Sequence, residues 1–399
     1  MQSGKIVVEN LFKVFGPDPK EILELVRKGW SKERILNERG AVIGVNDVSF
    51  SVNEGEIFVL MGLSGSGKST LIRLINRLIE PSDGDVYIDG YNVARLPKAS
   101  LVKLRRRDMS MVFQSFALMP TRTVLENAAF GLEVAGQGRK QREARAMEVL
   151  EQVGLAPFAH KYPPQLSGGM QQRVGLARAL AVNPSIIIMD EAFSALDPLK
   201  RREMQDVLLE LQKKERRTII FVSHDIEEAM RIGTRIGIME GGRLVQVGTP
   251  QQLIENPADD YVRTFFDTVD TSRYLTAGQL KADSVPLYVH NGKAPDALQV
   301  CRELQALDKH YAFVVNERNQ FRGSISLEKI ALMVESGQQR LEPELLKLIE
   351  PVPENLPLEE VIQRLVKNEG PIPVIDDSGN YSGAISKGRL LSRLQGEGA

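Results

Sequence analysis

The sequence predicts an α/β protein whose main domain is a largely parallel sheet covered by helices, followed by a smaller α+β domain. Between residues 71 and 270, helical patterns alternate with short apolar strands, SIIIMD, RTIIFVS and RIGIME. This alternation is typical of a parallel sheet with helices on its faces. A glycine-rich loop precedes this region, and beyond about residue 271 a repeat begins that is found nowhere else in the chain.

Composition limits the function classes. The 399 residues include 51 Lys and Arg against 52 Asp and Glu, a net charge of -1, so nothing indicates a nucleic-acid partner. The single cysteine, Cys301, excludes an internal disulfide and fits a reducing compartment. The N-terminus has no signal-peptide pattern, and the apolar runs are too short for a membrane helix. We therefore expect a protein inside the cell that serves any membrane from outside the bilayer.

The first segment of the chain alternates strands with a helical insert. Short β-like runs are KIVVENL, VNDVSFSV and EIFVLMG. Between the first two lies an insert of about residues 17–40, which we predict to be two short amphipathic helices broken at Gly29. Its apolar residues at roughly helical spacing are Ile22, Leu25, Val26, Ile35 and Leu36.

A second helical segment interrupts the sheet. Residues 115–166 contain TVLENAAFGLEVAG and RKQREARAMEVLEQVGL, with no strong strand run. We expect a helical sub-domain there, inside a nucleotide-binding domain that spans residues 1–270.

The C-terminal repeat has two copies, 60 positions apart. VVNERNQFRGSISLEKI begins at Val314, and VIDDSGNYSGAISKGRL begins at Val374. Each copy is predicted to form strand, polar turn, strand and helix, preceded by another helix. We assign residues 271–335 to the first copy and 336–399 to the second, and expect the two sheets to be buried against each other. The matching pairs include Val314 with Val374, Phe321 with Tyr381, Gly323 with Gly383, Ile325 with Ile385 and Ser326 with Ser386.

The glycine-rich loop has the context of a phosphate-binding loop. It follows the apolar strand EIFVLM and opens the helix LIRLINRLI. Glycines let backbone N–H groups converge on phosphate oxygens, the helix N-terminus adds its dipole, Lys68 supplies a cation and Ser69 a hydroxyl for Mg²⁺. The predicted ATP-binding residues are Gly62, Ser64, Gly65, Ser66, Gly67, Lys68, Ser69 and Thr70.

Two adjacent carboxylates end the strand SIIIMD. Burying Asp190 and Glu191 there is unfavourable without a balancing cation, and Mg²⁺ bound with ATP would supply one. Because neighbouring side chains diverge, Asp190 can serve the metal while Glu191 faces an attacking water as general base.

The segment LSGGMQQR resembles the signature sequence of ATP-binding cassette (ABC) proteins. The resemblance implies an ABC-type phosphate-loop domain that works as a homodimer. Ser167, Gly168 and Gly169 of one subunit would grip the γ-phosphate bound by the other, so that ATP is held between two copies. Met170 stands where the family usually has Gln, while the Ser and both Gly are retained.

The resemblance implies roles for further residues. Gln114 matches the glutamine that contacts Mg²⁺ and the water, and with Ser69 and Asp190 it completes the expected Mg²⁺ set. Asp197 matches the loop that crosses the dimer interface, and His224 the switch histidine near the γ-phosphate. Phe15 stands where the family stacks an aromatic ring, usually Tyr, on adenine. Glu191, His224 and Gln114 are thus the expected catalytic residues.

The C-terminal repeat resembles a pair of cystathionine-β-synthase (CBS) motifs, which often bind adenine nucleotides. With the N-terminal insert and MDEAFSALDP, the combination looks like the ATPase subunit of glycine betaine/proline osmoprotectant importers. This implies two membrane permease subunits, a periplasmic or extracellular solute-binding protein, and a peripheral place on the cytoplasmic face of the inner (plasma) membrane. The segment FALMPTRTVLEN is where we expect a permease to dock.

Other functions are less consistent with the sequence. A small-molecule kinase or a GTPase would not have LSGG with a paired Asp-Glu, and no Asn-Lys-x-Asp motif is present. A non-transport ABC ATPase would have a long coiled coil or two cassettes. An importer of another quaternary amine, such as choline or carnitine, or of an amino acid stays open, because this subunit does not touch the solute.

Overall fold

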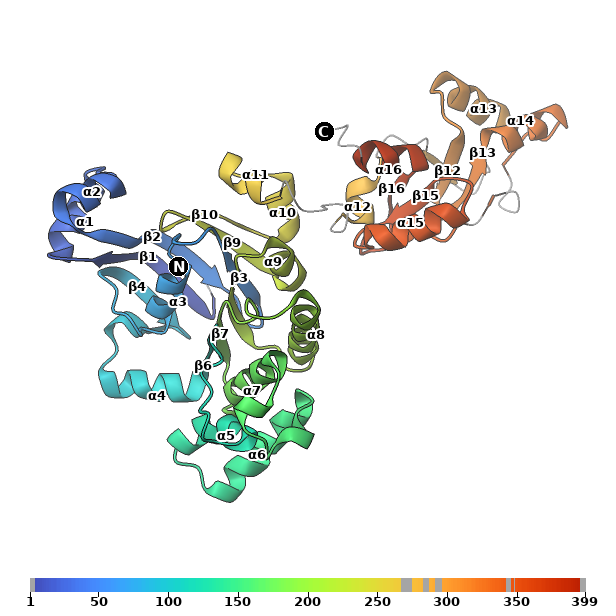
Figure 1. Cartoon of the computed structure of the whole chain (residues 1–399). Coiled ribbons are helices and arrows are strands. Elements are labelled where there is room, and N and C mark those ends of the chain that lie inside the picture. The colour runs from blue at the N-terminus through green and yellow to red at the C-terminus, as the bar shows by residue number, and fades with distance from the viewer. Residues whose placement is uncertain are drawn as a thin grey trace. The chain divides into compact units, whose positions relative to one another are not determined.

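The computed structural model describes residues 4–266, 275–282, 287–290, 296–341, 346–347 and 349–394. The chain divides into two compact units, Met1–Val269 and Asp270–Ala399, each described by itself (Figure 1). The predicted boundary at residues 270 and 271 lies outside the described residues. Within those described, no helix combines the length and apolarity needed to cross a bilayer.

The first unit begins with an antiparallel sheet of strand order β2-β1-β4-β5. The sequence predicts its first two strands but not this antiparallel arrangement. Ile6 pairs with Val52 on one side and with Ile88 on the other, so β1 is the strand between two partners. The strands are β1 (Ile6–Phe15), β2 (Val42–Val52), β4 (Asp83–Ile88) and β5 (Tyr91–Asn92).

The second sheet confirms the predicted α/β class. Its order is β10-β9-β3-β8-β7-β6, and every adjacent pair is parallel except β10 with β9. β3, β7 and β8 are buried throughout, as expected for parallel strands covered on both faces. The strands are β3 (Ile57–Met61), β6 (Met109–Val112), β7 (Ile186–Asp190), β8 (Thr218–Val222), β9 (Arg235–Glu240) and β10 (Arg243–Gly248).

One apolar core joins the two sheets. It combines Ile6 and Phe50 of the antiparallel sheet with Phe58 and Ile188 of the parallel one, and Leu71 of helix α3 lies among them. Helix α3 is therefore packed against the core that both sheets share. The helices associated with this core are α3 (Lys68–Ile75), α4 (Lys98–Asp108), α8 (Pro198–Lys214), α9 (Ile226–Ile232), α10 (Pro250–Glu255) and α11 (Asp260–Phe266), with a 3₁₀ turn at Val93–Arg95.

The segment between β6 and β7 is helical and lies at one end of the first unit (Figure 1). Its polar anchor is Asn127, fully buried, whose amide group donates to the carbonyls of Met119, Arg122 and Thr123. These bonds fix the chain where it enters the helices. The elements are α5 (Val124–Val134), α6 (Arg139–Gln152), α7 (Gly168–Ala181), and 3₁₀ turns at Ala156–Phe158 and Pro163–Gln165.

The insert forms two short helices, as predicted, α1 (Pro19–Arg27) and α2 (Lys32–Arg39), and Gly29 lies between them at φ 85°. Ile22 and Ile35 are buried in a small core that Phe12 of β1 completes. The expectation that Leu36 belongs to the apolar face is wrong. Its side chain is 50% exposed, because α2 has only one buried position, Ile35.

The second unit has two small sheets, β11-β12-β13 and β14-β15-β16. The two copies meet through aromatic rings: those of Phe313 and Tyr381 are 5.6 Å apart and those of Phe321 and Tyr381 6.3 Å apart. The elements are α12 (Ala277–Leu280), β11 (Leu287–His290), α13 (Ala297–Ala306), β12 (Tyr311–Asn316), β13 (Phe321–Ser326), α14 (Leu327–Glu335), β14 (Val352–Pro353), α15 (Leu358–Lys367), β15 (Ile372–Ile375), β16 (Tyr381–Ile385) and α16 (Lys387–Leu394).

Candidate functional site

The glycine-rich loop joins β3 to α3 and leaves no room for side chains at two positions. A Cβ on Gly62 would lie 2.2 Å from the carbonyl oxygen of Met239, and one on Gly67 2.3 Å from that of Gly44. Both glycines have positive φ, 147° and 102°. Glycine is therefore required here for conformation and for space.

Lys68 begins α3 and points back into its own loop. Its Nζ donates to the carbonyl oxygens of Gly62 at 2.8 Å and Leu63 at 2.9 Å. Burial lowers the pKa of Lys68, and the nearby Glu191 and Asp190 act in the opposite direction. The Nζ also donates to Ser66 Oγ at 3.5 Å. A buried cation bonded to neutral oxygen atoms is well suited to receive an anionic ligand.

Ser69 and Asp190 meet across 121 positions of the chain. The Ser69 Oγ donates to Asp190 Oδ1 at 2.9 Å, and Arg73 Nη2 lies 3.7 Å from Asp190 Oδ2. Burial raises the pKa of Asp190, while the Ser69 hydrogen bond and Arg73 lower it. A buried carboxylate beside a hydroxyl is a donor set that fits Mg²⁺. In the described residues no group of three or more His, Cys, Asp or Glu could hold a metal.

The three expected catalytic side chains lie together. Gln114 Nε2 donates to Glu191 Oε2 at 3.3 Å, and His224 Nδ1 lies 3.5 Å from the same oxygen. The order of strands in the sheet brings these three residues together. Asp190 of β7 pairs with Val222 of β8, and Val112 of β6 pairs with Met189 of β7. The residues just beyond these strand ends therefore share one edge of the sheet. Glu191 has a left-handed φ of 47°, an unfavourable conformation that concentrates at functional sites.

Phe15 lies next to the phosphate-loop helix. A Cβ added to Gly44 would meet the Phe15 ring at 2.8 Å and the Thr70 side chain at 3.3 Å. Phe15 is 40% exposed, and Lys13 Nζ lies over its ring, 5.1 Å from the ring centroid. Sequence reasoning missed Gly44, and a lone glycine inside a strand pattern is a signal of close approach that could have indicated it.

Ser167 and Asp197 lie apart from these groups. Each is a helix N-cap: Ser167 accepts from the N–H of Met170 at 3.4 Å, and Asp197 from that of Lys200 at 3.1 Å. In the part of the chain that the structure describes, Ser167, Gly168, Gly169 and Asp197 have no hydrogen bond or ion pair to the phosphate loop. Together with Lys200, Ser167 and Gly169 line a separate hollow of about 200 Å³.

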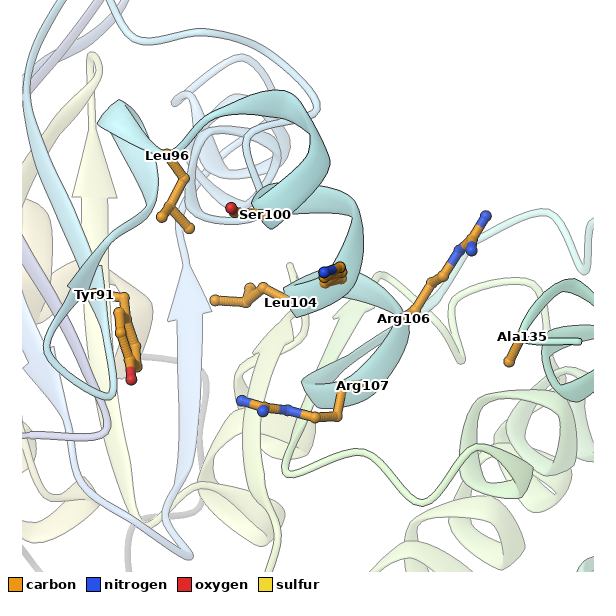
Figure 2. A pocket seen from close by; sticks show the side chains of 8 residues that line it. Tyr91, Leu96, Ser100, Leu104, Arg106, Arg107 and Ala135 are labelled. Carbon is orange, nitrogen blue, oxygen red and sulfur yellow. The ribbon is translucent and has the colours of Figure 1, made fainter.

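A larger hollow of about 650 Å³ lies along α4. Figure 2 shows Leu104 and Ser100 of that helix on one wall and Ala135, at the end of α5, across from Arg106. Tyr91 and Leu96 add apolar surface, and Lys103, Arg106 and Arg107 add positive charge. None of the residues that line this hollow was predicted from the sequence to be functional.

The second unit has a hollow of about 330 Å³ built from both copies of the repeat. Lys309, His310 and Phe313 come from the first copy, and Ser386 and Lys387 from the second. The polar groups and the aromatic ring give it the character of a ligand pocket.

Comparisons with known proteins agree with this arrangement. A family model described as "ABC transporter" matches residues 45–194, and one described as "CBS domain" matches residues 349–396. The glycine betaine/proline betaine transport system ATP-binding protein ProV of Escherichia coli (strain K12) is 48% identical over 99% of this chain and 98% of that protein. The glycine betaine transport ATP-binding protein OpuAA of Bacillus subtilis (strain 168) is 45% identical over 98% of this chain and 93% of its own length.

A third relative and one solved structure extend these findings. The glycine betaine/carnitine transport ATP-binding protein GbuA of Listeria monocytogenes is 46% identical over 98% of both chains. The dimeric structure of MJ0796, a bacterial ABC transporter cassette, covers 61% of this chain and 98% of its own, with 34% identity and a TM-score of 0.52. Near-full-length identities of 45% to 48% show that this chain belongs to the ABC transporter family, as an ATP-binding subunit with an ATPase coupled to transport and a C-terminal CBS domain.

Proposed function

We propose that this chain hydrolyses Mg-ATP to drive the import of glycine betaine or proline-type compatible solutes under osmotic stress. The observation that supports hydrolysis most is the meeting of Gln114 and His224 at one oxygen of Glu191. The adjacent Ser69–Asp190 pair supplies a place for the metal. Relatives named for glycine betaine transport support the solute class.

The residues have distinct roles in this proposal. Backbone N–H groups from Gly65 to Thr70 and the Lys68 ammonium bind the phosphates, and Phe15 stacks on adenine. Ser69, Asp190 and Gln114 hold Mg²⁺, which neutralises phosphate charge. Glu191 accepts a proton from the attacking water, and His224 stabilises the charge that develops on the γ-phosphate.

A second copy of the chain completes each site. Ser167, Gly168 and Gly169 lie at the N-terminus of α7, where backbone N–H groups and the helix dipole attract an anion. In this proposal they bind the γ-phosphate held by the partner copy, as the resemblance to the ABC family implies. Asp197 crosses the same interface. The dimeric state of the MJ0796 cassette supports this arrangement.

An ATPase subunit of an importer works with further proteins. Two permease subunits and a periplasmic or extracellular solute-binding protein complete the machine, and this subunit lies on the cytoplasmic face of the inner (plasma) membrane. The permease docks on the helical segment around FALMPTRTVLEN. The CBS pair regulates transport, and the hollow between its two copies takes an adenine nucleotide.

The test is transport in vesicles. The full-length subunit is reconstituted with its permease and binding protein, and ATP-driven uptake of labelled glycine betaine is measured at low and high internal salt. Uptake that rises with salt is expected, and deleting residues 271–399 should remove the salt dependence while ATP hydrolysis persists. Hydrolysis without betaine uptake at any salt would leave the ATPase and overturn the solute class. Choline, carnitine and proline would then be tested in its place.

A further inference from the structure

The segment between Glu191 and α8 connects two parts of the proposed site. Glu191 lies at the catalytic edge of the sheet, and Asp197, six positions later, caps α8 where the partner copy would contact it. The segment between them is held in turns: Ser194 N donates to the Glu191 carbonyl at 3.1 Å and Leu196 N to the Phe193 carbonyl at 3.2 Å. Phe193 and Leu196 are buried. Asp197 is therefore joined to Glu191 by a short segment that is packed and hydrogen-bonded.

Arg201 connects this segment to the switch histidine. It lies one turn into α8, and its Nη2 donates to the Leu196 carbonyl at 3.3 Å, directly before Asp197. Its Nη1 donates to Asp225 Oδ2 at 2.7 Å, and Asp225 directly follows His224. Both side chains are mostly buried, with 23% exposure for Arg201 and 31% for Asp225. One guanidinium thus binds the neighbours of Asp197 and of His224 at the same time.

Asp225 is held by Ser223, which precedes His224, and by Glu228, which follows it. Its N–H donates to Ser223 Oγ at 3.0 Å, and its Oδ1 accepts from Glu228 N at 3.1 Å. Ser223 Oγ is itself fixed by donation to buried Glu228. His224 lies between these two anchored residues, so its position depends on Asp225.

We propose that Arg201 is a positioning residue that couples partner contact at Asp197 to the placement of His224. The inference deepens the proposed function and rests on it. A guanidinium suits this role because its planar fork can make two separate hydrogen bonds at once. Arg201 does not touch nucleotide; it acts through Asp225, and hydrolysis then depends on closure of the dimer.

The test compares Arg201→Gln with Arg202→Gln in the full-length chain, by steady-state hydrolysis of Mg-ATP. Arg202 is the adjacent, exposed arginine, so the control makes the same charge change. Arg201→Gln should lower kcat roughly tenfold and leave the KM for ATP within about twofold, because a coupling of this size is typical between linked sites. Arg202→Gln should match the unaltered chain.

A second background separates positioning from general structure. In His224→Ala, Arg201→Gln should cause no further loss in single-turnover hydrolysis, because the residue it positions is absent. The same roughly tenfold loss in both backgrounds, an unchanged kcat, or a raised KM alone would overturn the coupling.

Asp225→Asn weakens the same Arg201–Asp225 interaction from the carboxylate side. It provides a second test if Arg201→Gln does not fold. It should reproduce the loss of kcat at unchanged KM, and normal hydrolysis by this variant would also overturn the proposal. An unaltered chain that hydrolyses no Mg-ATP would instead overturn the proposed function itself, so the two failures are distinguishable.

Discussion

Glycines with positive φ occur in both units, and their surroundings differ. In the phosphate loop, Gly67 lies against Gly44, next to the buried Lys68. In the repeat, Gly323 and Gly383 have φ of 155° and 152° and lie where the pairing of their strands shifts by one residue. The first case exposes backbone N–H groups to a ligand, and the second makes a bulge that directs a strand.

The charges around these two sets of glycines also differ. Around the loop, Lys68 and Asp190 are buried charges, and burial shifts the pKa of each toward its neutral form. Such charges are unfavourable until a ligand balances them. An added Cβ on Gly323 or Gly383 would meet Leu346, Lys281 and Ala282, so these two glycines lie against the protein's own chain. Substitutions in the two units should therefore have separable effects.

The largest effect is expected from Glu191→Gln. Removing the base should lower ATP hydrolysis by about 10² to 10⁴-fold, while the phosphate loop still binds nucleotide. We expect the variant to accumulate as an ATP-bound dimer, detected by gel filtration with and without Mg-ATP. A variant that is folded but stays monomeric with Mg-ATP would contradict the shared site.

Phe15→Ala should have the next largest effect. Loss of a stacked ring should weaken ATP binding by roughly 1–3 kcal/mol, measured by titration calorimetry with Mg-ATP. Phe15→Tyr keeps a ring and serves as the matched control, with affinity close to the original. Equal affinity of all three chains would show that adenine does not stack there.

Gly383→Ala should act on the repeat alone. A Cβ there would lie 3.0 Å from the Ala282 carbonyl oxygen at a φ of 152°, so we expect a loss of about 1–3 kcal/mol in the unfolding free energy of the second unit. Gly379→Ala is the control, because Gly379 also has positive φ but has nothing within 4 Å of an added Cβ. Thermal unfolding measures both, and a change in ATP hydrolysis by the isolated subunit would show that the units are not independent.

Glu228→Gln should have the smallest effect, and it depends on pH. Burial raises the pKa of Glu228, so its contribution to stability is fully present below the unfolded pKa and is lost as pH rises through the folded pKa. Glu228→Gln has no titrating carboxyl group at this position, so its stability does not fall in this way as pH rises. Between about pH 5 and 8 its stability relative to the original should rise by on the order of 1 kcal/mol. Chemical denaturation at several pH values measures this difference in unfolding free energy. Glu227 is exposed, so Glu227→Gln serves as the control, and its stability relative to the original should not change with pH.

The sequence predicted the elements that depend on neighbouring residues. Apolar runs gave β3, β7 and β8, Gly29 marked the break between α1 and α2, and the repeat was visible from paired residues. Expectations failed where packing decides. Leu36 fits an amphipathic pattern but is half exposed. The antiparallel pairing of β1 with β4 has no local signal, because α1, α2, β2, β3 and α3 lie between the two strands in the chain.

The candidate site divides in the same way. The phosphate loop, the Asp190–Glu191 pair and the repeated glycines are determined by the sequence itself, because contiguous residues and their backbone requirements define them. Only the tertiary structure decided that Gln114, 77 positions before Glu191, meets it at 3.3 Å, and that Arg201 reaches Asp225. Those contacts depend on which strands are adjacent in the sheet, and strand order is set by burial over the whole core.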